Sequence, residues 1–149
     1  MWDTIFSINT AIAMIGWAIL LFAPRRELPM TVVLYLGVAL LCLVYSVGLV
    51  GIVTGLFDPV GPADAAVDFT TIDGVQTIFA SRGGVTVGWT HYLAFDLFAG
   101  LWIARDADAK NVSRWIQAPI LLATFMAGPL GLLIWLVLRE TRRAPRRAD

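Results

Sequence analysis

Two ionisable side chains, His91 and Asp96, lie inside the apolar run 85–103 and are the residues best suited to chemistry. An imidazole and a carboxyl group held away from water can exchange protons with a ligand, so the pair can act as base and acid. On a helix, residues five apart point about 140° away from each other, so no single group faces both. In lipid such side chains are candidates for function, and the alternative for each is a structural hydrogen bond across a bundle.

Residues of three other apolar runs reach the depth of this pair if the runs are antiparallel helices. Asn9 reaches the depth of the histidine, and Tyr45 and the Gly128–Pro129 break reach that of the aspartate. Proline has no N–H to donate, so the break frees a backbone carbonyl near Phe125. These residues predict a polar pocket at mid-depth.

Aromatic side chains surround the predicted pocket, and such a lining suits a long, flat, hydrophobic ligand. Packing within the bundle is the simpler interpretation of most of these rings. The predicted ligand-binding residues are Asn9, Tyr45, Trp89, Tyr92, Phe95, Phe125 and Pro129.

Composition narrows the class of protein. Of 149 residues, 58% are apolar and 15% are charged, which is more apolar than a soluble domain of this size. The net charge is zero, so no nucleic-acid partner is expected. Cys42 is the single cysteine, which excludes a disulfide framework and a cysteine metal site within the chain. We predict no metal and no cofactor, although His91 among small residues offers room for the magnesium of a chlorophyll.

Four apolar runs have the length of about 20 residues that a helix needs to cross a membrane. The predicted fold is all-α: an integral membrane four-helix up-and-down bundle, formed by one domain over residues 1–149. The predicted spans are 5–23, 31–55, 85–103 and 118–138, followed by a basic tail at 139–149.

The connection 56–84 is long for so small a protein, and such loops often carry function. Its second half predicts a short helix that begins near Asp73 and ends at Gly83–Gly84. Val75, Ile78 and Phe79 share one face, so this helix is expected to lie in the membrane interface or to cover the mouth of the bundle. A passive surface helix is the alternative.

Charge gives no clear orientation. With four crossings, five Lys and Arg residues gather on one side and six on the other, and the basic tail then favours both termini in the cytoplasm. The start of the chain lacks the basic region of a secretory signal and the character of a transit segment, so we expect a bacterial inner-membrane protein. Gly51 and Gly55 form a GxxxG pair that fits either packing within the bundle or a homo-oligomer.

Two segments resemble the abscisic-acid-deficient-four-like family of membrane proteins. They are residues 88–100 (GWTHYLAFDLFAG) and 124–133 (TFMAGPLGLL), supported by Gly16–Trp17 and Gly74–Val75. Plant members of this family are linked to the formation of neoxanthin from violaxanthin, a 5,6-epoxy carotenoid. The resemblance implies an isomerisation without a redox cofactor, in which a base removes a proton from the polyene while an acid protonates the opening epoxide oxygen. The resemblance does not itself assign residues to these roles, for which His91 as base and Asp96 as acid or orienting group are suited.

Two functional hypotheses follow. The first is a membrane-embedded enzyme, an isomerase, that modifies a carotenoid or prenyl lipid through His91 and Asp96. The second is a non-catalytic protein that binds a carotenoid or another pigment, or an accessory subunit of a larger membrane complex, which the small size and the close-packing glycines favour.

Overall fold

A computed structural model describes residues 1–57 and 68–141, and all regular secondary structure among them is helical. Helix α1 spans Trp2–Phe22. A second continuous rod consists of α2 (Glu27–Val32), the π-helical segment η1 (Val33–Ala39) and α3 (Leu40–Val53). The short α4 (Ile72–Phe79) precedes the longest helix, α5 (Arg82–Ala109). The chain continues through α6 (Arg114–Met126) and α7 (Gly128–Thr141).

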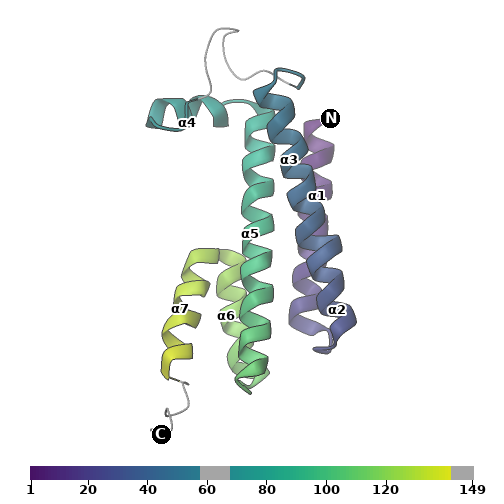
Figure 1. The fold of residues 1–149 in the computed structure, drawn as a ribbon, viewed down its shortest axis with the longest axis vertical. Helices are drawn as coiled ribbons and strands as arrows, with labels where there is room; N and C mark the ends of the chain where they lie inside the picture. The colour runs from purple at the N-terminus through teal and green to yellow at the C-terminus, as the bar shows by residue number, and fades with distance from the viewer. Residues whose placement is uncertain (58–67, 142–149) are drawn as a thin grey trace, which may run out of the picture.

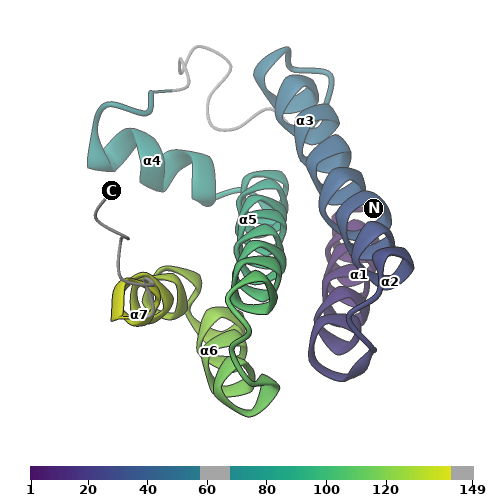
Figure 2. The same cartoon turned by 60° about the horizontal axis from the view of Figure 1, so that its bottom comes forward.

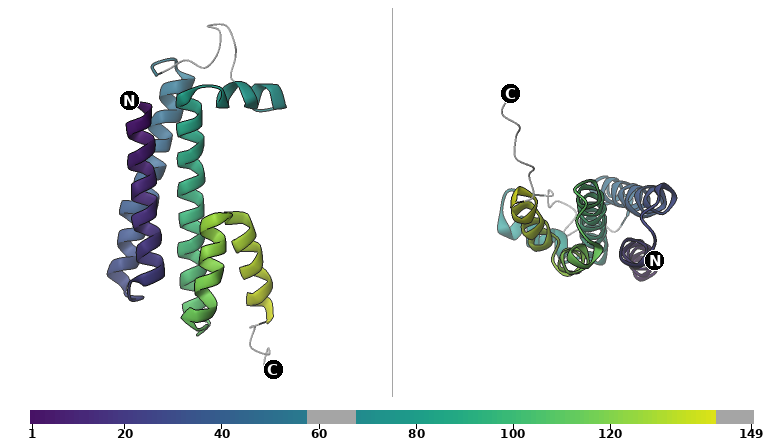
Figure 3. Two further views of the ribbon diagram at one scale, coloured as in Figure 1. Left: turned by 180° about the vertical axis from the view of Figure 1, so that it is seen from behind. Right: turned by 90° about the horizontal axis from the view of Figure 1, so that it is seen from below.

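The three long helices lie side by side, and α5 contacts α1, η1, α3, α4, α6 and α7 (Figures 1 and 3). Leu97 of α5 is fully buried where the helices meet, against Gly16 of α1 and Gly37 of η1. Trp17 packs over Gly100 one turn further along α5. We call the end of the bundle near Met1 and Arg82 the α4 end, and the end near Arg25 and Lys110 the basic end.

Two helices among the described residues are long and apolar enough to cross a membrane, namely Trp2–Phe22 and Glu27–Val53. They match the first two predicted spans. Helix α5 has 28 residues, or about 42 Å at the rise of an α-helix, which exceeds the hydrocarbon core. Its sequence is more polar than that of the other two.

The fourth predicted span is wrong as a single crossing, because residues 118–138 reverse direction in the middle. Helices α6 and α7 have 13 and 14 residues, so each is only about 20 Å long. They lie side by side as a hairpin, which covers the half of α5 at the basic end (Figures 1 and 3). The up-and-down bundle of four spans is therefore replaced by three long helices and a half-length hairpin.

The reversal has a local cause at residues 127–131. Ala127 leaves the helical region with φ −155° and ψ 84°, and its carbonyl then accepts the N–H groups of Leu130 and Gly131, which begins α7. Pro129 needs no acceptor for an N–H, so it fits the first turn of the new helix. A Cβ at Gly131 would collide with the backbone of Thr124, so this glycine allows the two helices to approach closely.

The short helix predicted in the connection 56–84 is present, with different ends. The Thr71 side chain caps α4 by accepting the Gly74 N–H, and the helix ends at Phe79 instead of continuing to Gly83–Gly84. Those two glycines lie in the first turn of α5, where the Ser81 side chain accepts the Gly84 N–H. Figure 2 shows α4 extending sideways from the start of α5. Residues 58–67 of the connection lie outside the described residues.

The termini and the glycine pair also differ from expectation. Met1 lies at the α4 end and Thr141 at the basic end, so the described chain does not begin and end on the same side (Figure 1). The tail residues 142–149 lie outside the described residues. Gly51 packs against Phe57 of the same chain, which favours packing within the molecule for the GxxxG pair.

Candidate functional site

Asp96 lies near the middle of α5 and is 7% exposed. One carboxylate oxygen, Oδ1, lies against Gly128, the first residue of α7, where a Cβ would collide with the carboxylate. The other oxygen, Oδ2, is buried and has no hydrogen-bond partner among the described residues. The predicted proximity of Asp96 to the Gly128–Pro129 break is therefore present in the structure, and the carboxyl group faces the tip of the hairpin.

The Tyr92 hydroxyl completes a small polar cluster at the hairpin tip. It donates a hydrogen bond to the Met126 carbonyl at 3.3 Å, and both this hydroxyl and the Gly128 N–H are hydrogen-bonding neighbours of the Asp96 carboxylate. The carbonyl that the break leaves for this cluster is that of Met126, one residue later than predicted. Phe125 instead packs edge-on against Trp17, with ring centroids 5.5 Å apart.

Asp96 opens into a pocket of about 640 Å³ between α5 and α7, which we call the hairpin pocket. Asp96 is the one charged side chain among the described residues that line it. Pro129 lies in its wall, as predicted for a ligand-binding residue. The described lining residues are Phe95, Asp96, Phe98, Ala99, Trp102, Gly128, Pro129, Leu132 and Leu136.

His91 lies on the outer face of α5, so its predicted burial within the bundle is wrong. Its ring lies beside those of Tyr45 and Phe95, with centroids 5.2 Å and 4.7 Å away. The outward position follows from the helix geometry, because Asp96, five residues further on, faces the hairpin. Tyr45 is thus a neighbour of the histidine rather than of the aspartate.

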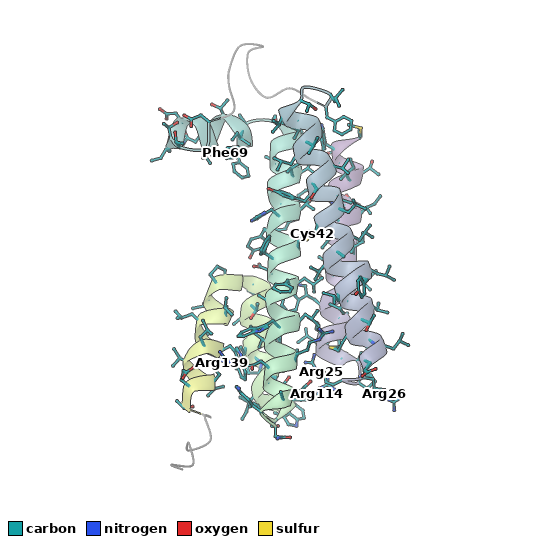
Figure 4. All side chains as sticks on the ribbon, in the orientation of Figure 1. Arg25, Arg26, Cys42, Phe69, Arg114 and Arg139 are labelled. Atoms are coloured by element: carbon teal, nitrogen blue, oxygen red, sulfur yellow. The ribbon has the colours of Figure 1, made fainter. Side chains whose placement is uncertain are left out.

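The histidine lines a second pocket, of about 220 Å³, which we call the α4 pocket. Phe79 of α4 forms part of its wall and packs against Gly88 of α5. Phe69, labelled in Figure 4, also lines it and comes from the segment before α4. Residues of α4 therefore share a pocket with His91 on the outer face of α5. Because α4 extends sideways from α5, it does not lie over the mouth of the bundle (Figure 2).

The segment before α4 is held by a local hydrogen-bond network. The carboxylate of Asp68 accepts the Thr70 N–H at 2.7 Å and the hydroxyls of Thr70 and Thr71 at 2.7 Å and 2.9 Å. These hydrogen bonds hold the pKa of Asp68 below its usual range. The Thr71 hydroxyl in turn caps α4, so the network fixes where this helix begins.

The two pockets meet at the His91–Phe95 ring pair, since His91 lines the α4 pocket and Phe95 lines the hairpin pocket. We call the two pockets together the α5 groove. From Gly84 at one end to Trp102 at the other, the groove extends over 18 helical steps, or about 27 Å along α5. A long ligand lying in it would pass both ionisable side chains, although the two do not face each other.

Four of the predicted ligand-binding residues are not among the described residues that line the groove: Tyr92 and Phe125, described above, and Asn9 and Trp89. The Asn9 side-chain amide donates to the Thr90 hydroxyl at 2.8 Å in the bundle interior. Trp89 stacks between Phe6 and Tyr92 and donates to the Thr10 hydroxyl at 3.1 Å. Both residues tie α1 to α5, which is a structural role.

Several lining residues were not among the predicted ones. Leu132 and Leu136 follow Pro129 at spacings of three and four, the pattern of one helix face, so a hairpin interpretation of residues 118–138 would have found them. Phe79 was expected on the apolar face of the short helix, but its contact with α5 depends on the corner between α4 and α5. Within residues 1–57 and 68–141, no three His, Cys, Asp or Glu side chains are placed to hold a metal ion.

Comparison with known proteins identifies the family. The model of the family described as ABA DEFICIENT 4-like matches residues 4–135, which include all of α5 and most of α1 and of the hairpin. No curated protein and no solved structure matches the chain. Because the family model covers most of its length, the chain belongs to the ABA DEFICIENT 4-like family.

Proposed function

We propose that this protein is embedded in a membrane, with α1, the α2–η1–α3 rod and α5 as spans and the α6–α7 hairpin re-entering from the basic end. Two of the three spans have the required length and apolar composition. In the hairpin's irregular turn Gly128 is buried against Asp96, and the Met126 carbonyl accepts the Tyr92 hydroxyl. Partners of this kind are what non-helical backbone needs at membrane depth. A bacterial inner membrane remains the expected location.

The ligand that we propose is a carotenoid or a similarly long prenyl lipid, bound along the α5 groove. Membership of the ABA DEFICIENT 4-like family favours a role connected with carotenoids. The groove is apolar over about 27 Å and is lined by rings of Tyr45, Phe95 and Trp102. A stiff polyene matches such a shape better than a flexible chain because it loses little conformational freedom on binding.

The observation that carries the proposal is that Asp96 lines the hairpin pocket while its enclosed Oδ2 has no hydrogen-bond partner among the described residues. Leaving one buried carboxyl oxygen without a partner costs about 1–3 kcal/mol, and a protonated Asp96 whose side chain turns into the pocket recovers this cost by donating a hydrogen bond to a ligand oxygen. In an isomerisation, Asp96 gives its proton to an epoxide oxygen as the C–O bond breaks, and His91 takes a proton from the polyene. Proton return from His91 to Asp96 leaves the atoms of the product equal to those of the substrate.

The experiment is expression of the chain in a bacterial host that makes epoxy-carotenoids, followed by pigment analysis. The wild type should convert the epoxide to an isomer of the same mass. Asp96→Asn keeps the shape of the side chain but removes the acid, and it should abolish conversion, as should His91→Ala. Asp3→Asn, at an exposed carboxylate, is the matched control and should convert normally. Equal conversion by wild type and Asp96→Asn would exclude the catalytic role.

A second function, binding without catalysis, is favoured by the exposed position of His91, which leaves it outside the buried polar cluster. In that case the host's pigments stay unchanged and a carotenoid co-purifies with the protein. Asp96→Asn should then weaken co-purification, whereas Asp3→Asn should not.

A further inference from the structure

A third pocket, of about 470 Å³, lies between α1, α3 and α5 at the α4 end, and we call it the wedge pocket. The pocket results from the way in which the helices pack. Helices α1 and α3 both pack on α5, but α1 contacts the second rod mainly at α2 and η1, so α1 and α3 leave a space between them. Met1, Trp2 and Phe57 contribute to its lining near the chain's start, where the Trp2 and Phe57 rings meet edge to face at 6.4 Å.

The wedge pocket is open on its side. Ile8 of α1 and Leu43 and Val47 of α3 line it, and all three are more than half exposed on the surface of the molecule. The opening therefore faces whatever surrounds the two most apolar helices, which in a membrane is the hydrocarbon of lipid chains.

The chemistry of the wedge pocket differs from that of the α5 groove. Its polar side chains are already engaged: Asn9 donates to Thr90 at 2.8 Å, and Thr90 donates to the Thr86 carbonyl at 2.7 Å. Thr86 donates to the Arg82 carbonyl at 2.8 Å. No charged side chain lines the pocket among the described residues. A plain hydrocarbon chain therefore fits the pocket best, because the polar side chains that line it already have hydrogen-bond partners.

A charged pair lies next to the same pocket. Asp3 and Arg82 form an ion pair at 3.0 Å with both side chains about three-quarters exposed, and they line a shallow surface depression together with Trp2 and Thr86. Trp2 and Thr86 also line the wedge pocket, so the two are adjacent. A guanidinium beside a carboxylate complements a phosphate beside an ammonium group, as in phosphatidylethanolamine.

We infer that the wedge pocket holds one acyl chain of a zwitterionic phospholipid, whose headgroup lies at Asp3 and Arg82. This inference rests on the membrane placement proposed above and not on the proposed reaction. The bound lipid fills the space between α1 and α3 and so stabilises their positions.

The test uses a substitution on α3 that fills the wedge pocket with a larger side chain. Val44→Phe enlarges a half-buried lining residue, and Val50→Phe, on the same helix but outside the lining and 58% exposed, is the matched control. The full chain, purified in detergent, is given one equivalent of phosphatidylethanolamine and the retained lipid is counted by native mass spectrometry. Wild type and Val50→Phe should retain one molecule, and Val44→Phe should retain at least tenfold less. Equal retention by all three overturns the inference.

A second measurement keeps the test decisive if Val44→Phe folds poorly. Phosphatidylethanolamine with brominated acyl chains quenches nearby tryptophan fluorescence, and Trp2 lines the pocket. One equivalent should quench the wild type measurably more than Trp2→Phe, and equal quenching contradicts the inference. Carotenoid binding should be unchanged in Val44→Phe, so a loss of carotenoid with normal phospholipid retention would also overturn it.

Discussion

Asp96 is held between the hairpin tip and an apolar pocket. Oδ1 faces Gly128, while Oδ2 is buried without a partner. The start of α7 carries a partial positive charge from its free N–H groups, which offsets part of the cost of the buried carboxylate. The side chain is therefore held in place through one oxygen, while the other is enclosed without a hydrogen-bond partner among the described residues.

Gly128 is the residue on which this arrangement depends most directly. Gly128→Ala places a methyl group where the carboxylate lies, so either Asp96 or α7 must move. We expect a loss of about 1–3 kcal/mol in the free energy of unfolding, measured by denaturation in detergent, together with loss of carotenoid co-purification. Leu130→Ala, two residues away and exposed, should cost less than Gly128→Ala and leave pigment retention unchanged. Normal carotenoid co-purification with Gly128→Ala would show that the hairpin tip does not contribute to ligand binding.

At the scale of elements, the hairpin is fastened to α5 at both of its ends. At the tip, Asp96 and Tyr92 contact the turn. At the basic end, Asp106 accepts hydrogen bonds from Trp135 Nε1 and Arg139 Nε, both at 3.0 Å. Arg139 also lies over the Trp102 ring at 5.3 Å from its centroid. Since Trp102 lines the hairpin pocket, the same contacts position one wall of the site.

Removing the hydrogen bonds to Asp106 at the basic end should increase the mobility of α7. Asp106→Ala takes away the acceptor for both donors, and we expect a loss of about 1–3 kcal/mol in unfolding free energy. Hydrogen exchange should become faster at the amides of residues 128–141. The control is Asp3→Ala, which breaks a highly exposed ion pair, should cost less than about 1 kcal/mol and should leave α7 unchanged. Unaltered exchange in Asp106→Ala would show that the tip alone holds the hairpin.

For the whole molecule, the hairpin changes the distribution of charge. Of the seven Lys and Arg residues that the structure describes, Arg82 alone lies at the α4 end, and the other six lie toward the basic end. Figure 4 shows four of them, Arg25, Arg26, Arg114 and Arg139, in the half of the molecule away from α4. If the protein spans a membrane as proposed, the positive-inside rule and this asymmetry of six to one predict that the basic end lies in the cytoplasm and the α4 end outside.

The orientation can be tested by labelling single cysteines in intact cells. Cys42→Ala removes the native cysteine, and Thr70→Cys or Glu27→Cys then adds one at an exposed position of the α4 end or the basic end. A membrane-impermeant maleimide should label Thr70→Cys in intact cells, and Glu27→Cys only after the cells are broken. The reverse pattern would invert the orientation and place the hairpin on the outer side.

The sequence by itself was enough to predict much of this protein. Apolar runs predict α1, the second rod and α5 as helices, and α1 and the second rod are long and apolar enough to cross a membrane. The depth of Asp96 matches that of Gly128–Pro129 because the rise per residue is constant along each helix. The resemblance carried by residues 88–100 and 124–133 led to the right family.

Only the tertiary structure decided three other features. The hydropathy of residues 118–138 is the same whether the segment crosses the membrane as one helix or reverses at Ala127. Hydropathy therefore cannot distinguish the two arrangements. Periodicity gives the angle between His91 and Asp96 but not which of them faces the neighbouring helices, and so it could not predict that His91 lies outside. The positive-inside rule needs the number of crossings before any charge can be assigned to a side. That number depends on the reversal at residues 127–131, to which the close contact between Gly131 and Thr124 contributes.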